Sequence, residues 1–223
     1  LNRDPWLLAT PNATLVLGPR TVTARGPDRA DRITRCTTAV WDPNADTSPI
    51  EAFVARVLPD PGVRHFLHKA LGYALSGEMK EQACFFLLRD GANGKSSLLE
   101  MVRGALGGFA VHVPFAVVAL AQRQSNPAAP DLARLPGARF LTMSEPRSGD
   151  TIDESVIKGM TGGDPMTVRA LYQEPFEFTP THKCFIAMNL KPGVPDDSHG
   201  AWRRIRLIPF TERLNPNGPD AAL

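Results

Sequence analysis

The sequence predicts an α/β fold, in which helices flank a parallel sheet and a small mixed β and helical module comes first. Short, largely apolar runs recur in the later part of the chain, at 84–88, 139–143, 183–188 and 205–208. Such runs are typical of strands that are covered on both faces. Helical stretches separate these runs, which favours a parallel sheet whose ligands bind outside the carboxyl ends of its strands.

Composition limits the classes of protein that remain. The 223 residues are 43% hydrophobic, enough for one domain core with a smaller module attached, and the net charge of +2 does not by itself indicate nucleic-acid binding. No apolar run approaches the ~18 residues of a membrane helix, so we expect no membrane association. Cys36, Cys84 and Cys184 lie far apart, a pattern typical of free thiols in a reducing compartment. The chain begins without a methionine, and we expect it to be a piece of a longer protein.

Residues 1–80 are expected to form the N-terminal module. Its β-like runs are 14–17, 21–23 and 33–41. Two short helices are predicted within 48–80, the first capped by Ser48 with Glu51 completing a capping box, the second starting at Asp60-Pro61. The rest of the chain divides into an expected core at 81–213 and a tail at 214–223.

A glycine-rich loop follows the first apolar strand. Its residues are Gly91, Ala92, Asn93, Gly94, Lys95, Ser96 and Ser97, and a helix is predicted from Ser96. Successive backbone N–H groups that lead into a helix N-terminus form a cradle for phosphate oxygens, which predicts a nucleotide site. Lys95 would then reach the β- and γ-phosphates, and the Ser96 hydroxyl would bind Mg²⁺. The strict phosphate-loop pattern fails at one position, because Arg89 stands where its first glycine should be, and the alternative is a strand-to-helix turn that only happens to use glycines.

Two later strands each end in one polar residue, Glu145 after 139–143 and Asn189 after 183–188. Beside a phosphate-binding loop, an acid at this place can hold Mg²⁺ or polarise the attacking water. Asn189 could orient that water. The alternatives are a surface carboxylate at a strand end and an asparagine in an ordinary turn.

The segment between these strands contains a Gly-Gly-Asp-Pro break at 162–165, which should end a helix and open a strand. A hairpin is predicted at 168–178. The alternative is an ordinary connection whose Lys and Arg side chains are solvated.

Six motifs stand in one order along the chain, and that order resembles the superfamily 3 helicase domain of phage and plasmid primase–helicases, a group related to the poxvirus primase–helicase. The resemblance is strong over 83–212 and looser over 1–80. Its motifs are Gly91–Ser97, Asp131–Arg139, Ser144-Glu145, Ile157–Tyr172, Asn189 and Ala201–Phe210.

The resemblance implies an AAA+-like P-loop ATPase that uses ATP and Mg²⁺, assembles as a hexameric ring and moves along single-stranded DNA. It assigns Lys95 and Ser96 to Walker A, Glu145 to Walker B, Asn189 to the sensor and Arg204 to the arginine finger. Ser96 and Glu145 are accordingly the expected metal ligands.

The segment 162–172 matches the motif that leads into the DNA-contacting hairpin of these rings. Lys158, Arg169 and Tyr172 are therefore the expected DNA-binding residues.

The function expected from the sequence is the helicase or translocase core of a phage or prophage replication primase–helicase, in the cytoplasm of a bacterial host. Its expected partners are single-stranded DNA, further copies of itself and other replication proteins. The alternative is a nucleotide-binding, DNA-binding assembly module of a decayed prophage that does not translocate. A small-molecule kinase would lack an evident acceptor site.

Overall fold

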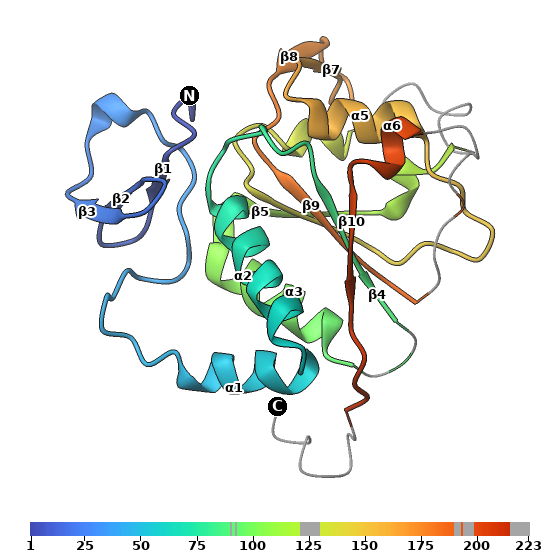
Figure 1. Ribbon diagram of the computed structural model, residues 1–223. Coiled ribbons are helices and arrows are strands. Elements are labelled where there is room, and N and C mark those ends of the chain that lie inside the picture. The colour runs from blue at the N-terminus through green and yellow to red at the C-terminus, as the bar shows by residue number, and fades with distance from the viewer. Residues whose placement is uncertain (90, 92, 121–129, 190–192, 194–198, 215–223) are drawn as a thin grey trace.

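The computed structural model describes the chain except for residues 90, 92, 121–129, 190–192, 194–198 and 215–223. Its centre is a parallel sheet with the strand order β10-β4-β9-β6-β5 (Figure 1). The strands are β4 (Cys84–Leu88), β5 (Ala110–Val113), β6 (Phe140–Met143), β9 (Lys183–Met188) and β10 (Ile205–Pro209). This sheet confirms the predicted fold class. The sequence reasoning had not identified β5.

Alternate side chains of each strand enter different hydrophobic clusters, because neighbouring residues of a strand point to opposite faces. Phe85 and Leu87 pack into the cluster that contains the buried residues of the first three helices. Those helices are α1 (Ser48–Val57), α2 (Pro61–Leu75) and α3 (Lys95–Leu106). Cys84 and Phe86 face the other cluster, which includes residues of α5 (Glu154–Gly162). The sheet is therefore covered on both faces, which explains why its strands are apolar runs rather than alternating ones.

The helix starts follow local chemistry. Asp60 caps α2 as expected, since its Oδ1 accepts from the backbone N–H of Gly62 and Val63 at 2.7 and 3.0 Å. The capping box predicted for Ser48 is wrong. The N-cap of α1 is Thr47, and Ser48 donates its own backbone N–H to Asp46 Oδ1 at 2.9 Å.

The N-terminal module contains a small antiparallel sheet of β1 (Leu7–Ala9), β2 (Thr14–Leu17) and β3 (Val22–Arg25), in that order. The strand expected at 33–41 does not form. Its backbone bonds instead go to β1, to α3 and to Gly108, as in Gly108 N–H to the carbonyl of Cys36 at 2.9 Å. The segment ties the module to the core, and no strand ladder can form across such dispersed partners.

The predicted hairpin is present, with β7 (Met166–Val168) antiparallel to β8 (Phe176–Phe178). Gly163 has a left-handed φ of 81° and ends α5, as the Gly-Gly-Asp-Pro break predicted. The hairpin, α5 and α6 (His199–Trp202) lie at the end of the sheet where β10 begins (Figure 1). The glycine-rich loop lies at the opposite, carboxyl end.

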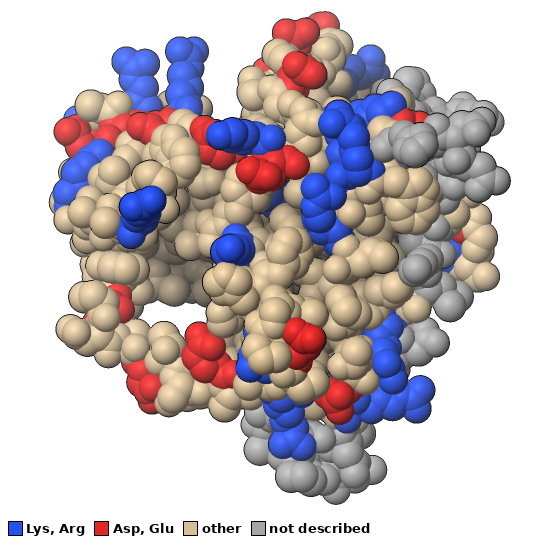
Figure 2. Space-filling view, viewed as in Figure 1, with Lys and Arg blue, Asp and Glu red and all other residues tan. Residues whose placement is uncertain are grey.

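Charged side chains of both signs are mixed over the face shown in Figure 2, in keeping with the balanced charge count. Within the described part of the chain, no helix combines the length and hydrophobicity needed to cross a membrane.

Candidate nucleotide site

The loop between β4 and α3 has the backbone that its glycines allow. Gly91 and Gly94 have positive φ angles of 87° and 79°. A Cβ at Gly94 would lie 2.7 Å from Val57 Cγ1 of α1, so the loop also packs too closely against that helix for a side chain. Arg89, at the position of the missing first glycine, is not among the described residues with positive φ. An arginine is therefore tolerated there. Ala92, also assigned to the loop, lies outside the described residues.

Lys95 begins α3 and is almost fully buried, with an exposed fraction of 4%. Its ammonium donates to the carbonyl of Arg89, to Asn93 Oδ1 at 2.9 Å and to Asn189 Oδ1 at 3.5 Å. Asn93 is itself held by donating from Nδ2 to the Arg89 carbonyl at 3.4 Å. The lysine is thus aimed back along the loop toward the end of β4, and its contacts reach β9 through Asn189.

The first turn of α3 is open to an anion. Its N-cap is Gly94, which has no capping side chain, so the first helical N–H groups receive no side-chain cap. Ser96 and Ser97 are exposed in this turn and line the same cleft as Lys95. The positive end of the helix and these hydroxyl groups suit a phosphate.

Glu145 and Asn189 meet at the carboxyl edge, as expected for residues that follow the neighbouring strands β6 and β9. Glu145 Oε1 accepts from the backbone N–H of Asn189 at 2.9 Å. A chain of contacts therefore joins Lys95, Asn189 and Glu145, from three separate elements. The structure brings together the residues assigned to Walker A, Walker B and the sensor.

These residues line one cleft of about 550 Å³, a volume within the range of small-ligand sites. Sequence reasoning missed part of the lining, namely Phe53, Arg103, His112, Thr142 and Leu214. Phe53 belongs to α1, so the N-terminal module contributes a wall of the cleft. His112 of β5 lies 3.0 Å from Thr142 Oγ1, and burial together with Arg103 lowers the pKa of its imidazole.

The described residues contain no group of three or more His, Cys, Asp and Glu side chains suited to a metal. Mg²⁺ does not need one, because it is commonly bound through one or two carboxylates together with substrate phosphates. Ser96 and Glu145 line the same cleft and offer a hydroxyl and a carboxylate oxygen. These donors fit a magnesium ion that arrives with a nucleotide.

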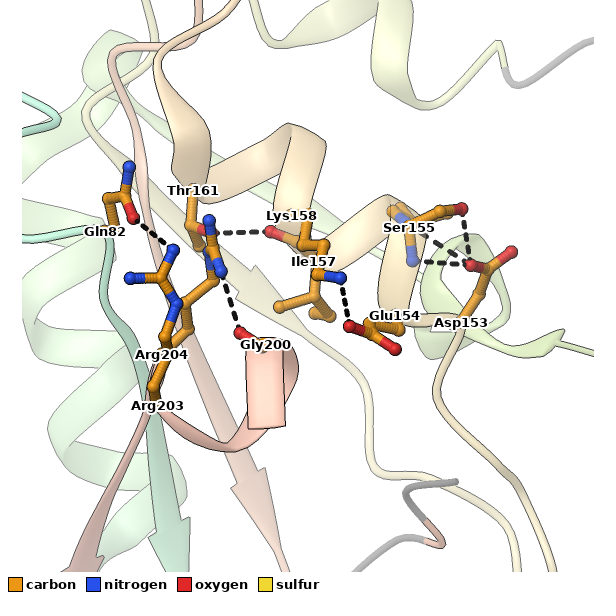
Figure 3. Close-up of polar contacts among 11 residues, drawn as sticks. Gln82, Asp153, Glu154, Ser155, Ile157, Lys158, Thr161, Gly200, Arg203 and Arg204 are labelled. Atoms are coloured by element: carbon orange, nitrogen blue, oxygen red, sulfur yellow. Dashed lines mark hydrogen bonds and ion pairs between the residues drawn. The ribbon is translucent and has the colours of Figure 1, made fainter. Parts of the chain in front are cut away.

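Arg204 lies at the opposite end of the sheet, the amino end of its strands, where its carbonyl accepts from Cys84 N–H at the start of β4. The five residues of β4 separate it from the loop by roughly 16 Å at the usual rise per residue. Its side chain is 7% exposed and donates to the carbonyl of Gly200 at 2.8 Å (Figure 3). Burial, followed by the charge of Arg203, lowers the pKa of Arg204. Arg203 is exposed and donates to Gln82 Oε1 at 3.2 Å.

The three residues assigned to DNA binding lie on two elements. Arg169 and Tyr172 lie in the turn of the β7–β8 hairpin, and Tyr172 is 100% exposed with a positive φ of 58°. Lys158 is instead on α5 and forms an ion pair with Glu154 beside Gly200 (Figure 3). The structure thus excludes a core position for Tyr172 and places Lys158 on α5 rather than in the hairpin turn.

Two family models match the chain. Residues 88–204, more than half of it, match the model described as "Family of unknown function (DUF5906)". The chain belongs to this family. Residues 1–59 match the model described as "D5 N terminal like". Viral proteins named as helicases and primases share this region, which confirms the resemblance to superfamily 3 helicases.

Three viral relatives illustrate the match. "Putative helicase L207/L206" of Acanthamoeba polyphaga mimivirus is 35% identical over 74% of this chain and 17% of its own length. "Putative helicase 022R" of Frog virus 3 is 32% identical over 81% and 19%. "Putative primase C962R" of African swine fever virus is 24% identical over 73% and 18%. The chain thus spans less than a fifth of each relative, and these relatives come from viruses of eukaryotes rather than from phages.

The C-terminal region of NrS-1, in its A form apo structure, has a similar fold, with a TM-score of 0.58. It is 9% identical, and the match covers 92% of this chain and 57% of that one. The likeness shows the fold of the chain.

Proposed function

We propose that this chain is the ATP-hydrolysing core of a viral replication helicase that moves along single-stranded DNA. The observation that carries the proposal is the contact chain from Lys95 through Asn189 to Glu145 in one cleft. A cation for phosphate, an amide and a carboxylate are the groups that phosphoryl transfer to water requires. The viral relatives named as helicases support the same reading.

The loop amides and the N-terminus of α3 would hold the phosphates, and the Lys95 ammonium would exchange its present acceptors for phosphate oxygens. Ser96 and Glu145 would hold Mg²⁺, which neutralises charge on the phosphates. Glu145 keeps one carboxylate oxygen on the Asn189 N–H. That leaves its other oxygen for Mg²⁺ or for the attacking water, and Asn189 lies beside it.

An arginine would complete the site from a neighbouring copy. Because Arg204 lies at the opposite end of the sheet from its own loop, it would meet a nucleotide across a subunit boundary, as in a ring of six copies, and its buried guanidinium would have to leave the Gly200 carbonyl to do so. The β7–β8 hairpin would contact DNA through Arg169 and Tyr172. We retain the division into a module at 1–80 and an ATPase core at 81–213. Other replication proteins as partners, a phage origin and the cytoplasm of a bacterial host stay predictions.

The test is a DNA-dependent ATPase assay on the wild type, Lys95→Ala and the matched control Lys69→Ala. Lys69 is an exposed lysine of α2. Loss of the phosphate-binding charge should lower turnover by at least about 100-fold, while Lys69→Ala should match the wild type. Circular dichroism checks that both variants fold. Near-wild-type turnover of Lys95→Ala would refute the proposal, and nucleotide binding without turnover in the wild type would identify a non-translocating module instead.

A further inference from the structure

The segment after β10 runs beside the glycine-rich loop. Phe210 N–H donates to the carbonyl of Leu88 at 3.1 Å. Arg213 Nε lies 3.7 Å from the position that a Cβ of Gly91 would take, and Leu214 Cδ1 lies 3.3 Å from that of Gly94. Three successive contacts thus place residues 210–214 along the loop, and Leu214 lines the cleft itself.

This arrangement puts a further cation, besides Lys95 and Arg103 of the cleft lining, next to Gly91 of the loop. Arg213 is exposed and forms no ion pair with a carboxylate among the described residues. An arginine stays charged and presents a planar fork that matches phosphate oxygens. Unlike Arg204, it belongs to the same edge of the sheet as the loop of its own subunit.

The position along the loop indicates which phosphate it would meet. In phosphate-binding loops the lysine reaches the outer phosphates, and here the Lys95 ammonium lies at the carbonyl of Arg89. Gly91 follows only two residues later, so Arg213 stands at the same end of the loop. The amides nearer α3 serve the inner phosphates at the helix N-terminus.

We infer that Arg213 binds the terminal phosphate of a nucleoside triphosphate within its own subunit. The inference rests on the proposed function and adds a residue that the motifs do not contain. Lys95 would reach the terminal phosphate from within the cleft and Arg213 from beside Gly91, so that the site distinguishes a triphosphate from a diphosphate.

The experiment measures binding of a non-hydrolysable ATP analogue and of ADP to the whole chain by titration calorimetry. Arg213→Ala should weaken binding of the analogue about tenfold and binding of ADP less than about threefold, because only the analogue has the terminal phosphate. Arg213→Lys should restore part of the loss, since it keeps the charge. Glu212→Ala, at the neighbouring exposed position, is the matched control and should bind both nucleotides as the wild type does.

The outcomes separate the two proposals. If the wild type binds neither nucleotide, the proposed function fails. If the wild type binds both and Arg213→Ala binds the analogue equally well, the inference fails alone. An equal loss for analogue and ADP would also overturn it, because Arg213 would then act on the inner phosphates or on the shape of the loop.

Discussion

Two buried lysines lie at opposite ends of the parallel sheet: Lys95, which begins α3 at the carboxyl end, and Lys183, which begins β9 at the amino end, with exposed fractions of 4% and 1%. Their acceptors differ in kind. Lys95 shares its ammonium among one carbonyl and two asparagine side chains at an open cleft. Lys183 donates to the carbonyls of Ser76 at 2.5 Å and Thr181 at 3.3 Å, with the Tyr73 ring centroid 4.3 Å away.

Arg139 repeats the pattern of Lys183 at the amino edge. Its Nη2 donates to the carbonyls of Asp4 and Leu7 at 3.0 and 3.3 Å, so it binds the N-terminal module to the sheet. Burial is the main cause that lowers the pKa of Arg139 to about 10 and that of Lys183 to about 7. A cation closed in by main-chain carbonyls has a structural role, whereas a cation held by side chains at a cleft can exchange them for a ligand.

Arg204 gives the largest expected effect. It lies at the amino end of the sheet, like Lys183 and Arg139, and yet it is proposed to act in catalysis. Arg204→Ala should bind ATP normally and hydrolyse it at least about 10³-fold more slowly, the effect of an arginine supplied across a subunit boundary. Mixing it with Lys95→Ala protein should restore part of the activity, since one mixed interface pairs an intact loop with an intact arginine. Steady-state ATPase assays and sizing of the mixture measure both effects.

Arg203→Ala is the comparison variant, because Arg203 is the exposed neighbour. A wild-type rate for Arg204→Ala together with a loss for Arg203→Ala would transfer the role to Arg203. If Arg204→Ala fails to fold, its contact with the Gly200 carbonyl is structural, and Arg204→Lys tests the charge alone.

Lys183 gives the next largest effect, on stability. The folded protein releases this proton near pH 7 and the unfolded chain near pH 10.4, so between these values the unfolded state binds more protons. Stability should therefore rise with pH over this window, by up to about 1.4 kcal/mol per pH unit, and stay level below it.

Lys183→Met should remove most of that slope. Denaturant unfolding between pH 7.5 and pH 8.5, well below the pKa of about 10 of Arg139 and the raised pKa of Tyr73, checks it. An unchanged slope in the variant would show that another group carries the pH dependence. Lys69→Met, an exposed lysine, is the control and should keep the wild-type slope.

The parts of the site that could be predicted from sequence are those set by local rules. A strand that meets a glycine-rich loop and a helix places Lys95, and the parallel topology brings Glu145 and Asn189 to the same edge. The strands β4, β6, β9 and β10 also form where the apolar runs predicted them, because strands covered on both faces need continuous apolar sequence.

The rest depended on contacts between distant segments. Phe53 reaches the cleft only because α1 packs under the loop, where Val57 faces Gly94. The run 33–41 forms no strand because its backbone bonds go to β1, to α3 and to Gly108 instead. Neither of these leaves a local pattern, since each is decided by which surfaces meet after folding.

Substitutions in the β7–β8 hairpin should give the smallest effect. They test whether the amino end of the sheet binds a ligand in addition to its structural role. Arg169 and Tyr172 are exposed in its turn, where arginine can contact phosphates and tyrosine can stack on bases. Replacing both with alanine should weaken single-stranded DNA binding by about tenfold or more and reduce its dependence on salt. Fluorescence anisotropy at two salt concentrations measures this, and ATPase activity without DNA should be largely spared.

The variant Lys158→Ala tests whether the DNA contact is made by the hairpin turn or by the neighbouring helix α5. Because Lys158 is already paired with Glu154 on α5, its replacement should change DNA affinity less than the hairpin variant does. Unchanged binding in the hairpin variant with a loss in Lys158→Ala would move the DNA contact from the turn to the face of α5. In that case Tyr172 would be exposed for another partner, and the amino end of the sheet would bind DNA through Lys158 of α5.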